Sequence, residues 1–343
     1  MMKRQLTLLF LAAVCGWSAS VAQPDDALNV QQTIQIANDN AQNVQQTVQI
    51  ADGMAQKVQQ HLETTGQPKA AEGKYTLTVG KLAMTIDAQK GGKILSFKHG
   101  DQEIISQLPW PEAFGSTFWT SPQKEWNWPP VVEFDKQPYA VEQKGDVLQL
   151  TSNVSEKLKC RVVKAFSVDT ADSAIVVTYS IKNESDAPRQ VAPWEITRVA
   201  NDGVIFFDAP TDGITPAGLM NFEGKYGAAW YKADEAPQNR KINADGHGWL
   251  AYCAKGLLLV KQFDDLEASQ PAPDEAEIQV YVNQRKTYIE LESQGAYATL
   301  QPGEQLSWTV RWYLLPVAEG AEPSETLLQK ALGVISSAAS RGR

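Results

Sequence analysis

The segment from Leu28 to Leu62 repeats every 14 residues. Its copies are NVQQTIQIANDNAQ from Asn29, NVQQTVQIADGMAQ from Asn43 and a partial KVQQHLETTG from Lys57. Fourteen residues are two heptads, and apolar positions spaced alternately four and three residues apart form the seam of a left-handed coiled coil. The seam positions are Val30, Ile34, Ala37, Ala41, Val44, Val48, Ala51, Ala55, Val58 and Leu62. We predict a Gln-rich heptad-repeat helix over residues 23–66, which forms a homo-oligomer or a spacer. A solvated Gln-rich arm is the alternative.

After the linker at residues 67–73, the pattern changes to short runs of β-forming residues separated by turn signals. The thirteen runs are Tyr75–Val79, Leu82–Ile86, Lys93–Phe97, Glu103–Ile105, Val147–Thr151, Lys159–Val168, Ala174–Asn183, Val204–Phe207, Trp249–Ala254, Leu257–Phe263, Glu277–Val282, Thr287–Glu292 and Gln305–Leu315. No helical pattern separates them. They predict an all-β, antiparallel domain over residues 74–318, built from two large sheets, rather than a βαβ enzyme.

The last segment, residues 319–343, predicts a helix and a tail. A helix start at Pro323 and Ser324 precedes apolar residues at helical spacing, so an amphipathic helix is expected over Pro323–Ala339.

The stretch Gly115–Pro130, GSTFWTSPQKEWNWPP, has neither helical nor strand periodicity. It holds Trp119, Gln123, Trp126 and Trp128 among prolines and hydroxyl residues. We predict a Pro-rich connection that forms either a core plug or the wall of a ligand site.

The N-terminus is typical of an export signal. Two basic residues precede an apolar run and a small-residue cleavage site, which predicts a signal peptide over residues 1–22 and a periplasmic or secreted protein. Cys15 does not lie in a lipoprotein signal, because Val14 stands where a small residue is needed, so no lipid anchor is expected. No other apolar run is long enough for a membrane span.

The amino-acid composition limits the classes of binding partner that the protein can have. The 343 residues carry a net charge of −9 without a basic cluster, which argues against nucleic acid and anionic membrane surfaces. Cys160 and Cys253 both lie in strand-like runs, where they either form a disulfide or are buried separately. No residue spacing suggests a zinc site, a dinucleotide-binding loop or a serine-hydrolase elbow, so no metal or cofactor is expected. Calcium held by Asp and Glu side chains is the alternative, but the sequence contains no diagnostic calcium-binding loop.

Two further stretches combine aromatic, acidic and basic side chains. VAPWEITRV contains Trp194, Glu195 and Arg198, and YIELESQGAY contains Glu290, Glu292 and Gln294. Because strand side chains alternate, Glu290 and Glu292 point to one face. They either bracket a cation or polar ligand or face water.

The late run ELESQ followed by GAY resembles the strand of the aldose 1-epimerase (galactose mutarotase) family that carries the catalytic glutamate, here matched by Glu292. The segments NESDAPRQVAP and GGKILSFKHGDQEII are similar to other parts of that family. The region Lys74–Leu315 resembles still more an uncharacterised family of exported bacterial proteins, through GSTFWTSPQ, PWE and ELESQGA. The resemblance covers about two thirds of the chain and implies a galactose mutarotase-like supersandwich.

The resemblance implies a sugar epimerase acting at the anomeric carbon, with Glu292 as the base. The family histidine that protonates the ring oxygen is absent from VAPWEITRV. Glu195 or Arg198 would have to assist, or His247 would have to reach in from its loop.

Saccharide binding suits the candidate residues, because pyranose CH faces stack on indoles while hydroxyls bond to Glu, Gln and Arg. We therefore predict a saccharide ligand held by Trp119, Gln123, Trp126, Trp128, Trp194 and Gln294. The alternatives are a non-catalytic carbohydrate-binding module on an oligomeric stalk, and an envelope scaffold whose β domain is inert.

Overall fold

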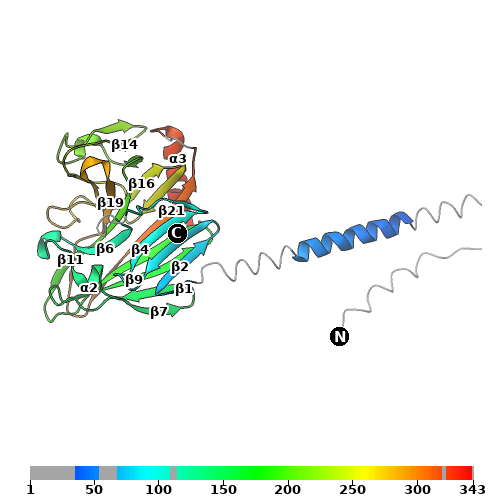
Figure 1. Cartoon of the computed structure of the whole chain (residues 1–343), viewed down its shortest axis with the longest axis horizontal. Coiled ribbons are helices and arrows are strands. Elements are labelled where there is room, and N and C mark those ends of the chain that lie inside the picture. The colour runs from blue at the N-terminus through cyan, green and yellow to red at the C-terminus, as the bar shows by residue number, and fades with distance from the viewer. Residues whose placement is uncertain (1–34, 54–67, 109–113, 319–321, 342–343) are drawn as a thin grey trace, which may run out of the picture. The chain divides into compact units, whose positions relative to one another are not determined.

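The computed structural model describes residues 35–53, 68–108, 114–318 and 322–341. The predicted signal peptide lies outside them, as do residue 67 of the predicted linker and the outer seam positions. The remainder of the predicted linker, residues 68–73, contains the strand β1 (Lys69–Ala71). The chain divides into two compact units, Met1–Leu62 and Glu63–Arg343, and each is described by itself (Figure 1).

In the first unit, residues 35–53 form one continuous helix. The seam residues Val44 and Val48 are 62% and 53% exposed, and Ile36 and Ile50 are exposed beside them. The predicted helix is confirmed over this range. Its association into a coiled coil remains a prediction.

The second unit contains two antiparallel sheets. The first sheet has the order β1-β2-β3-β4-β6-β11-β19-β18-β15, with β20 paired to β11 and β5 paired to β4. Its strands are β1 (Lys69–Ala71), β2 (Lys74–Val79), β3 (Leu82–Asp87), β4 (Lys93–His99), β5 (Gln102–Glu103), β6 (Ser116–Ser121), β11 (Arg189–Ala200), β15 (Arg240–Ala244), β18 (Ile278–Val282), β19 (Tyr288–Gln294) and β20 (Ala298–Leu300).

The second sheet has the order β13-β14-β12-β16-β17-β21-β10-β9-β8-β7. Its strands are β7 (Ala140–Lys144), β8 (Val147–Thr151), β9 (Cys160–Asp169), β10 (Ala174–Asn183), β12 (Val204–Phe207), β13 (Phe222–Lys225), β14 (Ala228–Lys232), β16 (Trp249–Ala254), β17 (Leu257–Gln262) and β21 (Gln305–Pro316). Short helical turns η2 (Gln123–Glu125), α2 (Val132–Asp135), η3 (Thr211–Gly213) and η4 (Gln284–Lys286) interrupt the loops.

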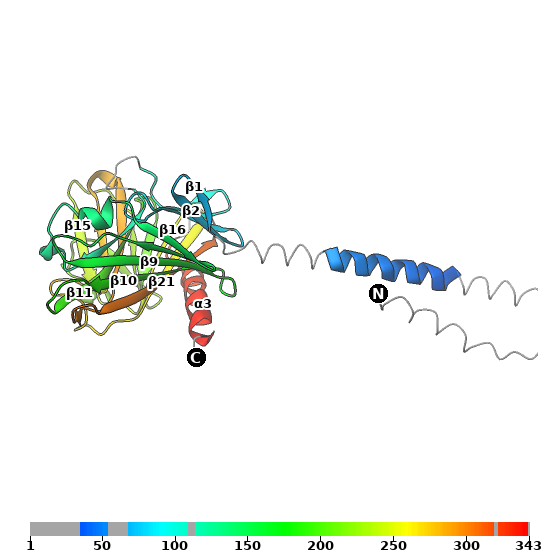
Figure 2. The same cartoon turned by 90° about the horizontal axis from the view of Figure 1, so that it is seen from below.

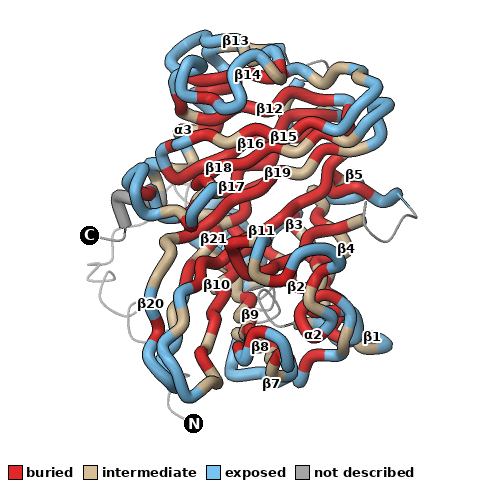
Figure 3. The backbone as a smooth tube through the Cα atoms, turned by 90° about the vertical axis from the view of Figure 1, so that its left-hand side faces the viewer, coloured by how far each residue is buried: buried red, intermediate tan, exposed pale blue. Residues whose placement is uncertain are grey.

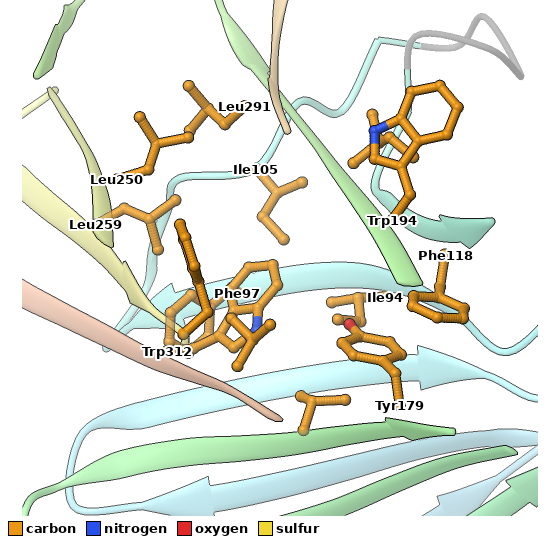
Figure 4. Close-up of a cluster of buried hydrophobic side chains, with 14 of the residues drawn as sticks. Ile94, Phe97, Ile105, Phe118, Tyr179, Trp194, Leu250, Leu259, Leu291 and Trp312 are labelled. Atoms are coloured by element: carbon orange, nitrogen blue, oxygen red, sulfur yellow. The ribbon is translucent and has the colours of Figure 1, made fainter. Parts of the chain in front are cut away.

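The inner faces of the two sheets form the core. Phe118 of the first sheet stacks on Tyr179 of the second at 4.4 Å between ring centroids, and Phe97 meets Trp312 edge to face (Figure 4). Buried residues run through the central strands of both sheets, and exposed residues gather in the outer turns (Figure 3). The predicted antiparallel β-supersandwich is confirmed.

The helix α3 (Glu325–Arg341) packs on part of the outer face of the second sheet. Leu327, Leu328 and Ala331 pack on apolar residues of β16 and β17, and Figure 2 shows the helix beside the sheet. Ser324 caps the helix, because its Oγ accepts the backbone N–H of Leu327 at 3.2 Å. The predicted C-terminal helix is therefore confirmed.

The prediction of a connection over Gly115–Pro130 is wrong in its first half, because Ser116–Ser121 form the central strand β6. All six residues are buried, so the strand lacks the alternation of exposed and buried positions that identifies a half-buried strand. Gly115 brings this strand close to β4: its φ is +69°, and a Cβ there would lie 2.4 Å from the Ile94 carbonyl oxygen.

The two cysteines do not pair. Cys160 in β9 and Cys253 in β16 are free, buried thiols, which decides between the two alternatives. Burial raises the pKa of each thiol to about 11, so neither is a reactive thiolate. Over the described residues, no helix has the length and apolar character needed to cross a membrane.

Candidate functional site

Strand pairing in the first sheet brings the candidate residues together. Trp194 of β11 lies opposite Trp119 of β6 on one side and Gln294 of β19 on the other. Arg198 lies opposite Glu290 in the same ladder. The segments around Trp119 and Trp194 are therefore adjacent strands of one sheet, and the side chains of Trp119, Trp194, Arg198, Glu290 and Glu292 project from its outer face.

Glu292 is fully buried at the centre of this face. Its Oε2 accepts hydrogen bonds from Trp194 Nε1 at 2.8 Å and from Lys241 Nζ at 2.9 Å. Its Oε1 has no hydrogen-bond partner among the described residues. Burial raises the pKa of Glu292 to about 7, against the opposing effect of Lys241. The carboxyl group can therefore take up and release a proton near neutral pH.

Arg198 supplies a buried cation to the same cavity, paired with Glu290. It is only 2% exposed, and its Nε donates to Glu290 Oε1 at 2.9 Å. The guanidinium lies over the Trp119 ring at 5.6 Å from the centroid. Its Nη1 has no partner in the described part of the chain, so one donor of a fixed fork is available to a ligand.

A cluster of tryptophans holds the aromatic wall. Trp119 makes edge contacts with Trp126, Trp128 and Trp194 at centroid distances of 5.5, 6.3 and 5.5 Å. The Trp119 Nε1 donates to Asp135 Oδ1 at 3.0 Å, which fixes the ring. Trp128 is 60% exposed, so its face is available for stacking.

These side chains line one cavity of about 540 Å³. Six predicted site residues border it: Trp119, Gln123, Trp128, Trp194, Arg198 and Glu292. Its volume lies within the roughly 300–1,000 Å³ of small-molecule sites. The cavity therefore holds aromatic faces, a carboxyl and a guanidinium together.

Sequence reasoning missed several residues of this cavity, which are Asn239, Arg240, Lys241, Tyr281 and Tyr288. Lys241 matters most, because its Nζ bonds Glu292 and lies 4.7 Å from the Trp194 ring centroid. The strand β15 that carries it was not predicted, because its sequence RKINA has too few apolar positions to stand out. The alternation of polar residues with Ile242 was the available signal.

Three predicted residues lie outside the cavity lining. Glu195 is fully buried on the opposite face of β11, where it forms an ion pair with Lys261 of the second sheet and accepts hydrogen bonds from Ser116 and Thr197. Trp126 is buried and supports Trp119 and Trp194. Gln294 is buried next to Glu275 and Gln279, to which its Nε2 donates.

His247 does not reach this site. It lines a different cavity with Asp245 and Asp265, and its Nδ1 lies 3.1 Å from the Asp208 carbonyl oxygen. The carboxyl at Glu195 and the imidazole at His247 therefore cannot act on a ligand beside Glu292 in this arrangement.

No family model matches the sequence, and no curated protein matches it. Solved structures do. A candidate aldose 1-epimerase from Escherichia coli K12 is 15% identical with a TM-score of 0.50, covering 71% of this chain and 99% of that one. A galactose mutarotase-like protein from Lactobacillus casei is 12% identical with a TM-score of 0.51, covering 70% and 100%.

A TPR-domain containing protein from Parabacteroides distasonis is 13% identical with a TM-score of 0.52. The match covers 74% of this chain and 49% of that protein. At such identities the likeness shows the fold alone. The β domain has the galactose mutarotase-like fold.

Proposed function

We propose that this protein is exported and acts on a saccharide, interconverting the anomers of a free sugar with Glu292 as the base. The observation that carries the proposal is the placement of Glu292, a buried carboxyl of raised pKa with an unpartnered oxygen, in a cavity walled by indoles. A base is most effective when its pKa lies near the working pH.

The chemistry follows from the groups that line the cavity. Glu292 Oε1 takes the proton of the anomeric hydroxyl while an acid gives a proton to the ring oxygen. The bond between the anomeric carbon and the ring oxygen then breaks, leaving an open-chain aldehyde. Rotation about the next carbon–carbon bond and the reverse proton transfers close the ring as the other anomer.

Lys241 is the acid that best fits this scheme. An ammonium group can give up a proton and regain it, whereas an arginine guanidinium stays protonated in proteins. The Lys241 Nζ lies 2.9 Å from Glu292 Oε2 and is one-third exposed, so it is placed to contact both the carboxyl group and a ligand. Arg198 then serves to bind and orient a sugar hydroxyl through its unpartnered Nη1.

A second candidate is a non-catalytic carbohydrate-binding module. It is favoured by the exposed face of Trp128 and by the missing histidine. Such a module would bind the same sugars without accelerating any reaction. Its binding would depend on Trp119 and Trp128 and not on the ionisation of Glu292.

We also propose that the heptad-repeat helix joins copies of the chain. Its exposed Val44 and Val48 lie four residues apart on the seam and have no apolar cover within the described residues. A second copy of the same helix is the partner that fits a repeating seam.

The proposal is tested by exchange NMR on a panel of free aldoses and uronates. We expect faster anomer interconversion for at least one sugar, and slower interconversion in Trp128→Ala through weaker binding. Tyr226→Ala is a matched control, because Tyr226 is an exposed aromatic residue that does not line the Glu292 cavity. Binding without acceleration would select the module, and neither binding nor acceleration would reject both candidates.

A further inference from the structure

A second and larger cavity adjoins the first. Its volume is about 680 Å³, and it shares Trp119, Trp128 and Arg198 with the cavity that holds Glu292. The two spaces therefore meet at one aromatic and cationic boundary. A ligand in the first cavity that extends past Trp128 enters the second.

The second cavity is cationic. Its described lining includes Lys74, Lys90 and Lys136, from β2, the turn after β3 and the residue after α2. Within the described ranges, the amines of these three lysines have no ion-pair or hydrogen-bond partner. Three unpaired amines around one hollow create a positive potential that attracts anions.

The acidic residues of the same cavity are already engaged. Asp87 accepts the backbone N–H of Gln89 at 2.9 Å. Asp135 accepts bonds from Thr117 at 3.1 Å and Trp119 at 3.0 Å, and it faces Lys93 at 3.9 Å. These hydrogen bonds do not remove the charge of either carboxylate, but the lining has five cations, Lys74, Lys90, Lys93, Lys136 and Arg198, against two carboxylates, so its net charge is +3.

Arg198 provides the independent observation. Arg198 is only 2% exposed, and it borders both cavities. Its Nε donates to Glu290, whereas its Nη1 has no partner among the described residues. A buried guanidinium with a free donor is suited to an anionic oxygen. Because Arg198 borders both cavities, it would contact a ligand that extends from one into the other.

We propose that the ligand is an oligosaccharide of at least two rings, whose second ring carries an anionic group that binds among Lys74, Lys90 and Lys136. This inference rests on the proposed function, since the first ring occupies the Glu292 cavity. The anionic group is a carboxylate, as in a uronic acid, or a sulfate ester. The two share negatively charged oxygens but differ in size and geometry.

Calorimetric titration of the full mature chain tests the inference. The probes are galactose, digalacturonic acid, its methyl ester and a sulfated galactose disaccharide. We expect the charged disaccharides to bind more tightly than the ester, and the difference to shrink as salt rises past about 0.15 M, where the Debye length is about 8 Å. Preference between the uronate and the sulfate identifies the anion.

The variant pair Lys90→Ala with Lys136→Ala should weaken binding of the charged disaccharide by roughly five- to tenfold and leave galactose binding unchanged. The control pair Lys81→Ala with Lys98→Ala removes the same charge outside both cavities and should change neither.

Equal binding of the charged disaccharides and the ester would overturn the inference while leaving the proposed function standing. An equal loss in the control pair would also overturn it, because the effect would then come from net charge alone. Failure of every saccharide to bind would overturn the proposed function itself, and the inference with it.

Discussion

The indole of Trp194 donates a hydrogen bond to Glu292 Oε2 at 2.8 Å, joining the neighbouring strands β11 and β19 on the outer face of the sheet. A donor to a carboxylate stabilises its charged form, so Trp194→Phe should raise the pKa of Glu292 further. The pKa should rise by roughly one unit, and the pH at which activity rises should increase by the same amount. A pH–rate profile measures this shift.

Trp308→Phe is the control for that substitution. Trp308 is equally buried, and its Nε1 makes no hydrogen bond to the described residues, so the profile should stay in place. The same displacement in both variants would mean that loss of packing, and not of the bond to Glu292, changes the pKa.

Substitution of Lys241 should lower catalysis while leaving saccharide binding nearly unchanged. Lys241→Arg keeps the positive charge beside Glu292 but cannot supply a proton at neutral pH. We expect kcat to fall by roughly 10²–10⁴-fold with little change in KM. Steady-state rates of anomer interconversion measure both constants, and a variant with unchanged kcat would remove Lys241 from the role of acid.

The ionisation of Glu292 should also appear in folding stability. The pKa of Glu292 in the folded protein is about 7, against an ordinary value of 4.5, because burial disfavours the carboxylate. The folded state therefore holds the proton more tightly, and the stability from this group is present at low pH and lost as pH rises through 7.

Glu292→Gln removes that titration. Between pH 5 and pH 8, the variant should lose less unfolding free energy than the wild type, by at most about 3 kcal/mol. Glu277, whose pKa is also raised to about 7 by burial, contributes the same slope to both proteins. Urea unfolding at the two pH values measures the difference, and parallel slopes would place the Glu292 pKa near its ordinary value.

The ion pair between Glu195 and Lys261 should be structural. Both side chains are fully buried between the sheets, and Lys261 Nζ also donates to the Leu291 carbonyl oxygen at 3.1 Å. Lys261→Met leaves a buried charge without its partner and should cost about 3–5 kcal/mol of unfolding free energy. Adding Glu195→Gln should recover much of this loss in urea unfolding. No recovery would show that the two residues act separately.

The heptad-repeat helix should control assembly. The substitutions Val44→Asp and Val48→Asp place charges on the seam and should convert an oligomer to a monomer in sedimentation. Gln45→Asp with Gln46→Asp adds the same charge beside the seam and should leave the oligomer intact. A wild-type protein that is already monomeric would contradict the proposed association.

The sequence was sufficient for the two-sheet class and for most of the long strands, but not for β6, β15 or the pairing of the strands. Long strands such as Ala174–Asn183 are rich in β-branched and aromatic residues and are bounded by turn signals, so they could be located from the sequence. The contact of Glu292 with Trp194 spans 98 residues and depends on the register of β11 against β19, which no local pattern records.

Alternation also failed where both faces of a strand are buried. β6 has Phe118 in the core and Trp119 in the site, so neither face is exposed and polar and apolar residues occur on both. Glu195 and Arg198 show a different limit: alternation places residues three apart on opposite faces of β11, but it does not say which face meets the core. Only the orientation of the strand decides which one can meet a ligand.

The most direct test of the central claim is the rate of galactose anomer exchange at pH 7, measured by NMR for the wild type, Glu292→Gln and the exposed control Glu304→Gln. We predict acceleration by the wild type and by Glu304→Gln, and loss of the acceleration in Glu292→Gln while galactose still binds. Equal acceleration by the wild type and Glu292→Gln would contradict the assignment of Glu292 as the base.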